Sequence, residues 1–170
     1  MKTSDDKIKG REENGRHQVG AAFSLIGKRG LPVIDNIHEE CGIFGIVDSD
    51  RDSVAHDAYC GLYALQHRGQ ESCGIAVADT DCEMSCYKGM GLVGDVFSPD
   101  ILNTLKGSTA IGHVRYSTTG GSVYKNAQPL VSQYKRGTFA IAHNGNLTND
   151  AELRAQLEEE GAIFQTNVDS

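Results

Sequence analysis

The sequence changes character at residue 41, and this change limits which part of the chain can fold. Residues 1–40 are mostly polar and carry seven basic and seven acidic residues, with short apolar stretches that glycine and proline interrupt. From Cys41 onward, apolar residues recur with the spacing of strands and helices. We therefore predict a largely disordered leader over residues 1–40 and a folded part over residues 41–170.

Segments with strand and helix periodicity follow one another in a mixed order. The run CGIFGIV at residues 41–47 predicts a buried strand, and apolar residues spaced as on one helix face predict a helix over residues 52–66. The order strand, helix, several strands, helix predicts an α+β fold in which helices pack on a largely antiparallel sheet. The other segments that we predict are strands over residues 73–78, 83–89, 109–118 and 137–145, and a short helix over residues 99–105.

The C-terminal part of the sequence predicts one more helix and the start of a strand. Asn149 and Glu152 have the spacing of a capping box, and Leu153 and Leu157 then predict an amphipathic helix that ends at Gly161. The sequence AIFQTNVDS after this helix has the pattern of a strand that is cut off. We therefore expect the domain to be incomplete at its C-terminus.

Composition and charge argue against several classes of protein. The length of 170 residues suits one domain, and no apolar stretch approaches the roughly 20 residues of a membrane helix. The net charge of −7 comes entirely from residues 41–170, so a clustered basic face for nucleic acid is not expected. The leader lacks the apolar core of a secretory signal, and its acidic residues argue against a transit peptide. We therefore expect a cytoplasmic protein that binds neither nucleic acid nor membrane.

The sequence holds five cysteines, and a reducing compartment would keep them as free thiols. Cys82 and Cys86 are spaced C-x3-C, but the sequence lacks the second cysteine pair and the histidine pair of a zinc module. We predict no metal site here and expect these thiols to be small side chains on a strand. A small metal or redox protein is an alternative that metal analysis would identify.

Polar residues gather in three segments that otherwise resemble strand ends and turns. These are QHRGQES at residues 66–72, GHVRYSTTGG at residues 112–121 and AHNGNLTND at residues 142–150. Taken singly, each arginine or histidine suits a surface ion pair or a buried structural role, and NG and GG are common hairpin turns. Because sites are often built on loops at the ends of rigid strands, the three segments together behind Cys41 indicate a functional site.

Five motifs resemble one enzyme family. CGIFGIV, YALQHRGQES, GHVRYSTTG, AQPL and AHNGNLTND, in this order, are similar to the glutaminase part of glutamine phosphoribosylpyrophosphate amidotransferases, over residues 39–170. These are class II, N-terminal-nucleophile (Ntn) amidotransferases, which implies an αββα layered sandwich. Glucosamine-6-phosphate synthases share the start and the His-Asn-Gly turn but differ at residues 67–71 and 114–116. They stay an alternative, as does a catalytically silent binding module on the same fold.

The resemblance implies that Cys41 is a nucleophile. We expect the leader to be removed, as in the family's precursor-bearing members, so that Cys41 becomes the first residue. A peptide nitrogen is not basic, whereas a freed α-amine has a pKa of about 7.7–8.0 and can take the proton of the thiol. It can later pass this proton to the leaving ammonia. Asn144 and Gly145 resemble the family's oxyanion hole, which stabilises the tetrahedral intermediate.

Three further residues resemble the family's contacts to glutamine. Arg115 matches the residue that pairs with the α-carboxylate, where a planar guanidinium fits two oxygens. Asp169 matches the carboxylate that holds the α-ammonium, and Thr118 lies where a substrate-contacting hydroxyl is expected. Arg68 is expected to support the loop around Cys41 rather than to touch glutamine.

Some positions depart from the family pattern or lie beside it. Cys73 stands where alanine is expected and should pack as a compact side chain. Asn167 and Val168 stand where Thr-Ser is expected before the predicted carboxylate. His113 and His143 are adjacent to predicted site residues, and we interpret both as structural.

The resemblance also implies what a full-length protein would do. In the family, the ammonia passes to a second domain that binds phosphoribosyl pyrophosphate with magnesium. The product is 5-phosphoribosylamine, in the first committed step of purine (IMP) synthesis. We expect no cofactor in residues 41–170; magnesium, and in leader-bearing members a [4Fe-4S] cluster, would bind beyond residue 170. We expect the full-length protein to be a homo-oligomer.

Overall fold

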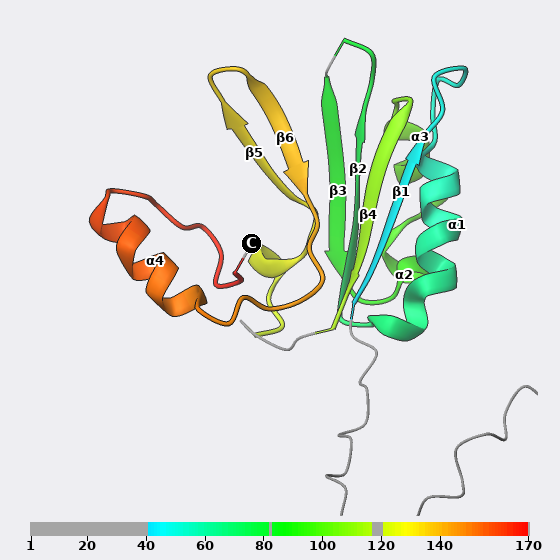
Figure 1. Cartoon of the computed structure of the whole chain (residues 1–170). Helices are drawn as coiled ribbons and strands as arrows, with labels where there is room; N and C mark the ends of the chain where they lie inside the picture. Colours follow the sequence, from blue (N-terminus) through cyan, green and yellow to red (C-terminus); the bar gives the residue numbers. More distant parts are fainter. Residues whose placement is uncertain (1–40, 82, 117–120, 170) are drawn as a thin grey trace, which may run out of the picture. The chain divides into compact units, whose positions relative to one another are not determined.

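Residues 41–81, 83–116 and 121–169 are described by a computed structural model (Figure 1). The predicted leader, Cys82 and Thr118 lie outside the described residues. In chain order the elements are β1 (Gly42–Val47), α1 (Ala55–Leu65), the 3-10 helix η1 (Gln66–Arg68), β2 (Ser72–Ala78), β3 (Met84–Met90), α2 (Val93–Val96), α3 (Pro99–Thr104), β4 (Thr109–Arg115), the 3-10 helix η2 (Tyr124–Asn126), β5 (Leu130–Tyr134), β6 (Gly137–Ile141) and α4 (Asp150–Glu159).

The strands form two antiparallel groups. The larger is a four-stranded sheet with the order β1-β4-β2-β3, and the smaller is the hairpin β5–β6. In the larger sheet, Gly42 lies opposite Val114 and Ser72 lies opposite Arg115, so the start of β1, the start of β2 and the end of β4 meet at one edge. The predicted α+β class with a largely antiparallel sheet is therefore confirmed.

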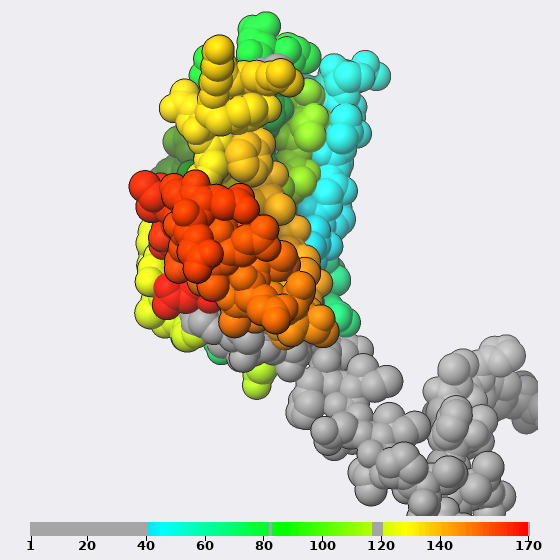
Figure 2. Space-filling model, turned by 60° about the vertical axis from the view of Figure 1, so that its left-hand side comes forward, coloured from blue at the N-terminus to red at the C-terminus, as the bar shows by residue number. Residues whose placement is uncertain are grey.

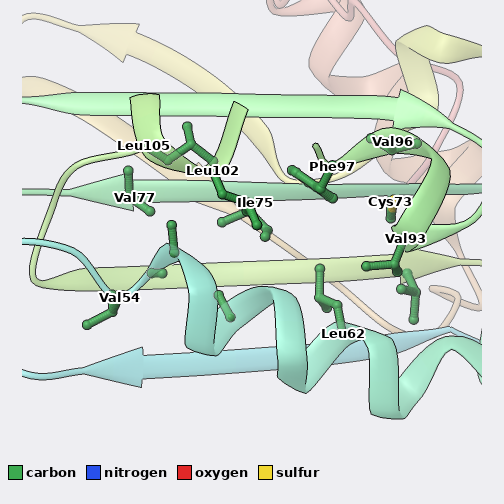
Figure 3. Packing of buried hydrophobic residues seen from close by; sticks show 14 residues of the cluster. Val54, Leu62, Cys73, Ile75, Val77, Val93, Val96, Phe97, Leu102 and Leu105 are labelled. Carbon is green, nitrogen blue, oxygen red and sulfur yellow. The ribbon is translucent and has the colours of Figure 1, made fainter. Parts of the chain in front are cut away.

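Helices α1, α2 and α3 pack on one face of the four-stranded sheet (Figure 1). Strand residues alternate between faces, so Ile75 of β2 and Val114 of β4 meet Leu62 of α1 in one fully buried layer, as Figure 3 shows for the cluster. Gly112 allows this close approach, because a side chain there would begin 2.9 Å from Leu62. Burying a leucine of this kind stabilises the fold by about 1.5–3 kcal/mol.

The segment before β5 covers part of the opposite face of the sheet. A Cβ atom on Gly74 would lie 2.4 Å from the backbone oxygen of Gln128, and Lys88 Nζ donates a hydrogen bond of 2.6 Å to the oxygen of Ala127. Asn126 is fully buried, and Gln128 is 5% exposed. The backbone of residues 127 and 128 therefore lies over β2 and β3. The two buried amide side chains need fixed hydrogen-bond partners.

The hairpin and the segment after α4 lie beside each other. Figure 2 shows β5 and β6 in yellow next to the orange and red residues of α4 and the segment that follows it. A cavity of about 430 Å³ is lined by Leu130 and Val131 of β5 and by Phe164. None of the described helices has the length and apolar character that crossing a membrane would require.

The structure corrects several predicted boundaries. The strand predicted over residues 137–145 ends at Ile141, because the amide of His143 donates to the side chain of Gln128 instead of to a strand. The strand predicted over residues 109–118 ends at Arg115. Strand β5 and helix α2 were not predicted, because LVSQY and VGDV are too short for a clear period.

The predicted capping box and final strand are wrong. Asn149 is the N-cap residue of α4, but its side chain makes no capping hydrogen bond among the described residues. Leu153 and Leu157 are 39% and 42% exposed, so the described contacts bury neither completely. Residues 162–169 form no strand, because their backbone pairs with side chains: the Thr166 oxygen accepts from Arg154, and the Asn167 amide donates to Asn126.

Candidate active site

The thiol of Cys41 lies at the edge where β1 and β4 meet. Antiparallel pairing of these strands brings the start of β1 to the end of β4, so Cys41 reaches the first residue after β4. Its Sγ is 3.4 Å from the oxygen of Tyr116 and 3.3 Å from the nitrogen of Tyr116. An N–H group at this distance can donate to a thiolate, which stabilises the nucleophilic form of the sulfur.

Arg68 holds the backbone of Cys41 on both sides. The Cys41 nitrogen donates to the Arg68 oxygen at 3.0 Å, and Arg68 Nε donates to the Cys41 oxygen at 2.7 Å. Cys41 has a φ of 56°, a left-handed conformation that costs a non-glycine residue of order 1–3 kcal/mol. The two hydrogen bonds offset part of this cost. The geometry therefore fits the supporting role predicted for Arg68.

The turn after β6 carries Asn144 and Gly145. The His143 amide donates to Gln128 Oε1 at 2.6 Å, which ties the start of the turn to the segment over the sheet. Asn144 Oδ1 lies 3.1 Å from Nε2 of His113, a residue of β4. Gly145 has a φ of 131°, which side chains other than glycine rarely adopt. The predicted oxyanion-hole pair thus lies on a turn that is held by His113 of β4 and by Gln128 of the segment before β5.

His113 is fully buried beside this turn. Burial lowers its pKa to about 4; the charges of Arg115 and His143 lower it as well, while hydrogen bonds to Asn144 and the His143 backbone oppose this. His113 is therefore neutral near pH 7, and only one of its ring nitrogens carries a proton.

Arg115 is linked through Asn126 to the segment that carries Asp169. Arg115 is 5% exposed, and its Nη1 donates to the Asn126 oxygen at 3.0 Å. The side chain of Asn126 accepts a hydrogen bond from the Asn167 amide, two residues before Asp169. Asp169 Oδ2 accepts a hydrogen bond of 2.6 Å from the Leu147 amide.

Asp169 also approaches the turn that carries Asn144. Its Oδ1 is 3.7 Å from His143 Nδ1, and its side chain is 6% exposed. The structure therefore brings Asp169 to the same turn as Asn144 and Gly145, while Cys41, Arg68 and Arg115 lie at the meeting of β1, β2 and β4. The predicted contact of Thr118 lies outside the described residues.

Sequence reasoning missed three residues that hold this arrangement. The backbone of Tyr116 contacts the thiol, Asn126 links Arg115 to the segment with Asp169, and Gln128 holds the turn that carries Asn144 and Gly145. Tyr116 and Gln128 lie inside motifs named above, but nothing in those motifs shows that their polar groups point to the site. Asn126 immediately precedes AQPL, and its burial could not be predicted because a polar side chain is usually expected at the surface.

The other described thiols do not resemble Cys41. Cys73 is buried in the core, and desolvation first, with Asp95 adding to it, raises its pKa to about 12. Such a thiol stays protonated, so Cys73 acts as the compact core residue that was predicted. Cys60 and Cys86 are exposed and free. Within residues 41–81, 83–116 and 121–169, no group of three or more His, Cys, Asp or Glu side chains could hold a metal ion.

Comparisons with known proteins agree on one family. Residues 113–170 match a family model described as a glutamine amidotransferase domain. The amidophosphoribosyltransferase of Methanothermobacter thermautotrophicus is 51% identical over 135 residues, which cover 79% of this chain and 28% of that protein. The same enzyme of Methanocaldococcus jannaschii is 53% identical over 130 residues, which cover 76% of this chain and 27% of that protein. This chain is a relative of the amidophosphoribosyltransferases.

A solved structure extends this relationship to the fold. The glutamine phosphoribosylpyrophosphate amidotransferase of B. subtilis, complexed with ADP and GMP, superposes with a TM-score of 0.67 at 44% identity. The match covers 75% of this chain and 27% of that one. The resemblance to amidophosphoribosyltransferases is thus confirmed by sequence and by structure. The chain spans about a quarter of the length of the relatives it matches.

Proposed function

We propose that this chain is the glutaminase part of an amidophosphoribosyltransferase, and that Cys41 hydrolyses glutamine to glutamate and ammonia. The observation that carries the proposal is the position of the Cys41 thiol at the β1–β4 edge, within 3.3–3.4 Å of the Tyr116 backbone. The identity of about half of all aligned residues with amidophosphoribosyltransferases supports it.

The fold proposed with this function is an Ntn αββα sandwich. Helices α1, α2 and α3 supply one outer layer, and the four-stranded sheet supplies the next. The hairpin β5–β6 would begin the second sheet. The close contact of Gln128 with Gly74 supports this, because it places the segment before the hairpin on the face without helices.

The proposed reaction is an acyl transfer in two steps. The Cys41 sulfur attacks the side-chain carbonyl carbon of glutamine, and the α-amine of Cys41 accepts the thiol proton. The C–N bond then breaks, and the protonated amine passes its proton to the leaving nitrogen, which departs as ammonia. Water attacks the thioester that remains, and glutamate is released with the thiol restored. Asn144 and the Gly145 amide would donate hydrogen bonds to the oxyanion in both steps.

The α-carboxylate and α-ammonium of glutamine would be held by Arg115 and Asp169. A buried guanidinium offers a planar pair of donors, and a nearly buried carboxylate offers acceptors for the ammonium. The hydroxyl of Thr118 is proposed as a further contact. Asp169 contacts His143 and Leu147, which lie on either side of Asn144 in one turn. Binding of the ammonium to Asp169 would therefore also set the distance between glutamine and the oxyanion hole.

The activity of the whole protein is proposed from its relatives. The ammonia would aminate phosphoribosyl pyrophosphate to 5-phosphoribosylamine, the first committed step of purine synthesis. Magnesium and a [4Fe-4S] cluster are proposed for parts of the protein other than residues 41–170. The described residues do not fit a cluster, because their thiols do not group with other ligands. We also propose that the full-length protein is cytoplasmic and homo-oligomeric.

A test compares versions of the full-length protein by glutamate release. One version keeps residues 1–40, one begins at Cys41, and one begins at residue 41 with the substitution Cys41→Ser. The matched control begins at Cys41 and carries Cys60→Ser, because the Cys60 thiol is exposed. Mass spectrometry verifies each amino terminus. We expect turnover from the version beginning at Cys41 and from the control, and a loss of about 10³-fold or more in Cys41→Ser. Undiminished glutamate release by Cys41→Ser would refute the proposed function.

The version with residues 1–40 tests the role of the leader separately. If its amino terminus stays intact, we expect no glutamate release, because the nitrogen of Cys41 is then an amide. Glutaminase activity with an intact leader would refute this part of the proposal alone.

The alternative is a glucosamine-6-phosphate synthase-type amidotransferase. The relatives reported above are amidophosphoribosyltransferases, which favours the first proposal. The acceptor decides between the two: phosphoribosyl pyrophosphate should support product formation, and fructose 6-phosphate should not.

A further inference from the structure

His113 is the most deeply buried ionisable side chain near the proposed site. It lies on β4 between Gly112 and Val114, and both of these neighbours face α1, so His113 faces the opposite side of the sheet. Its side chain is 0% exposed. A buried polar ring of this kind must be explained by the groups that it bonds.

The described side-chain partner of the ring is Asn144, and the backbone of His143 also hydrogen-bonds with the ring. Nε2 of His113 lies 3.1 Å from Oδ1 of Asn144, whereas Nδ1 has no hydrogen-bond partner among the described residues. An amide oxygen only accepts, so a hydrogen bond to it requires the proton on Nε2. The opposite arrangement, with an unprotonated Nε2, would draw the amide nitrogen of Asn144 toward the ring.

These two arrangements have different consequences for an oxyanion hole. An oxyanion needs a donor, and in a neutral asparagine side chain only the amide nitrogen donates. With the oxygen held by His113, the amide nitrogen is left for the oxyanion. With the nitrogen held by His113, the amide would present its oxygen to a developing negative charge.

We propose that His113 is a positioning residue that fixes the amide of Asn144 with its donor end toward the reacting carbonyl. The proposal rests on the proposed function, because it assumes that Asn144 donates to the oxyanion. Burial keeps the ring neutral, as its lowered pKa indicates. A neutral ring holds one proton, and the Asn144 oxygen then selects the tautomer.

Three variants of the mature full-length protein separate hydrogen bonding from packing. In His113→Gln, the amide nitrogen can take the place of Nε2 and donate to Asn144. In His113→Asn, the amide reaches only the position of Nδ1, and His113→Met fills similar space without a donor. We expect His113→Gln to keep kcat for glutamine hydrolysis within a few fold. We expect His113→Asn and His113→Met to lower kcat by about 10–100-fold with little change in KM, which is less than a lost oxyanion donor costs.

A double-variant cycle tests whether His113 acts through Asn144. Asn144→Ala should lower kcat by about 10²–10³-fold, and adding His113→Met to it should cause no further loss. If the two losses multiply, or if His113→Met equals the unchanged protein, the positioning role is overturned. If Asn144→Ala itself leaves kcat unchanged, the proposed function is what fails. Thermal unfolding and the protection of the buried Cys73 from alkylation show that each variant is folded, and His113→Gln against His113→Met decides the outcome if His113→Asn does not fold.

Discussion

The burial of His113 has a consequence for stability as well as for chemistry. A histidine with a pKa of about 6.5 when unfolded and about 4 when folded binds its proton more readily in the unfolded chain. The folded state therefore loses stability as the pH falls from about 6.5 to about 4, by about 3 kcal/mol in all. Arg115 and His143 are the charged groups that face this ring, and both disfavour its protonation.

We predict that His113→Gln flattens this pH dependence. Hydrogen-exchange protection of peptides from β4, measured in the mature protein at several pH values between 4.5 and 7, should fall with pH in the unchanged protein and much less in the variant. His56→Gln is the control, because His56 is exposed on α1 and should leave the slope unchanged. An identical slope in His113→Gln would show that another group sets it.

At the scale of elements, the approach of η1 to β4 helps to fix the position of Cys41. Gly69 follows η1 and has an extended backbone, so its conformation suits any residue. The space around Gly69, however, admits no side chain. A Cβ atom there would lie 2.6 Å from the backbone carbonyl carbon of Val114 and 2.7 Å from the nitrogen of Arg115. Arg68, which precedes Gly69, holds the Cys41 backbone.

We predict that Gly69→Ala destabilises the domain by about 1–3 kcal/mol and lowers glutamine turnover, because η1 must move away from β4. Gly94→Ala is the matched control. Gly94 lies in α2, and the atom nearest to its added Cβ would be 4.0 Å away, so alanine should be neutral or stabilise by up to about 1 kcal/mol. Thermal unfolding and glutamate release measure both changes. Equal behaviour of the two variants would contradict the importance of this contact.

Elements with a clear period could be predicted from the sequence, and those held by single side chains could not. The strands in CGIFGIV and TAIGHVR could be predicted because apolar residues recur along them on a face that packs against the core. AIFQTNVDS has a similar composition but forms no strand, since Asn126 and Arg154 bind its backbone. These partners lie 41 and 12 residues away in the chain, and no local pattern reports them.

The candidate site divides in the same way. Cys41, Asn144, Gly145 and Arg115 could be named because they lie in motifs of a recognisable family. The role proposed for His113 could not be predicted, because a histidine beside a site residue is equally compatible with simple packing. The proposal instead rests on the distance from its Nε2 to Asn144 and on its burial, which only the structure provides.

At the scale of the whole molecule, binding of glutamine should stabilise the proposed site. A ligand that binds only the folded state adds about 2.7 kcal/mol at a concentration 100 times its Kd. We predict that L-glutamine raises the unfolding temperature of the mature Cys41→Ser protein, in which turnover of the substrate should be at least about 10³-fold slower.

The same variant with Arg115→Lys should lose most of this shift, because lysine cannot pair with both oxygens of a carboxylate. Arg136→Lys, at an exposed position in the β5–β6 hairpin loop, is the control and should keep it. Differential scanning fluorimetry over a glutamine titration measures all three, with D-glutamine as the inactive ligand. A full shift in Arg115→Lys would remove Arg115 from the proposed substrate contacts.

The hydrogen bond from the Cys41 nitrogen to the Arg68 oxygen matters before the proposed enzyme is mature. The nitrogen that we propose as the catalytic base already occupies a fixed place while it is still part of an ordinary peptide link. Maturation would then need the hydrolysis of one covalent bond and no refolding. Such a precursor could be stored inactive and switched on without rebuilding its interior.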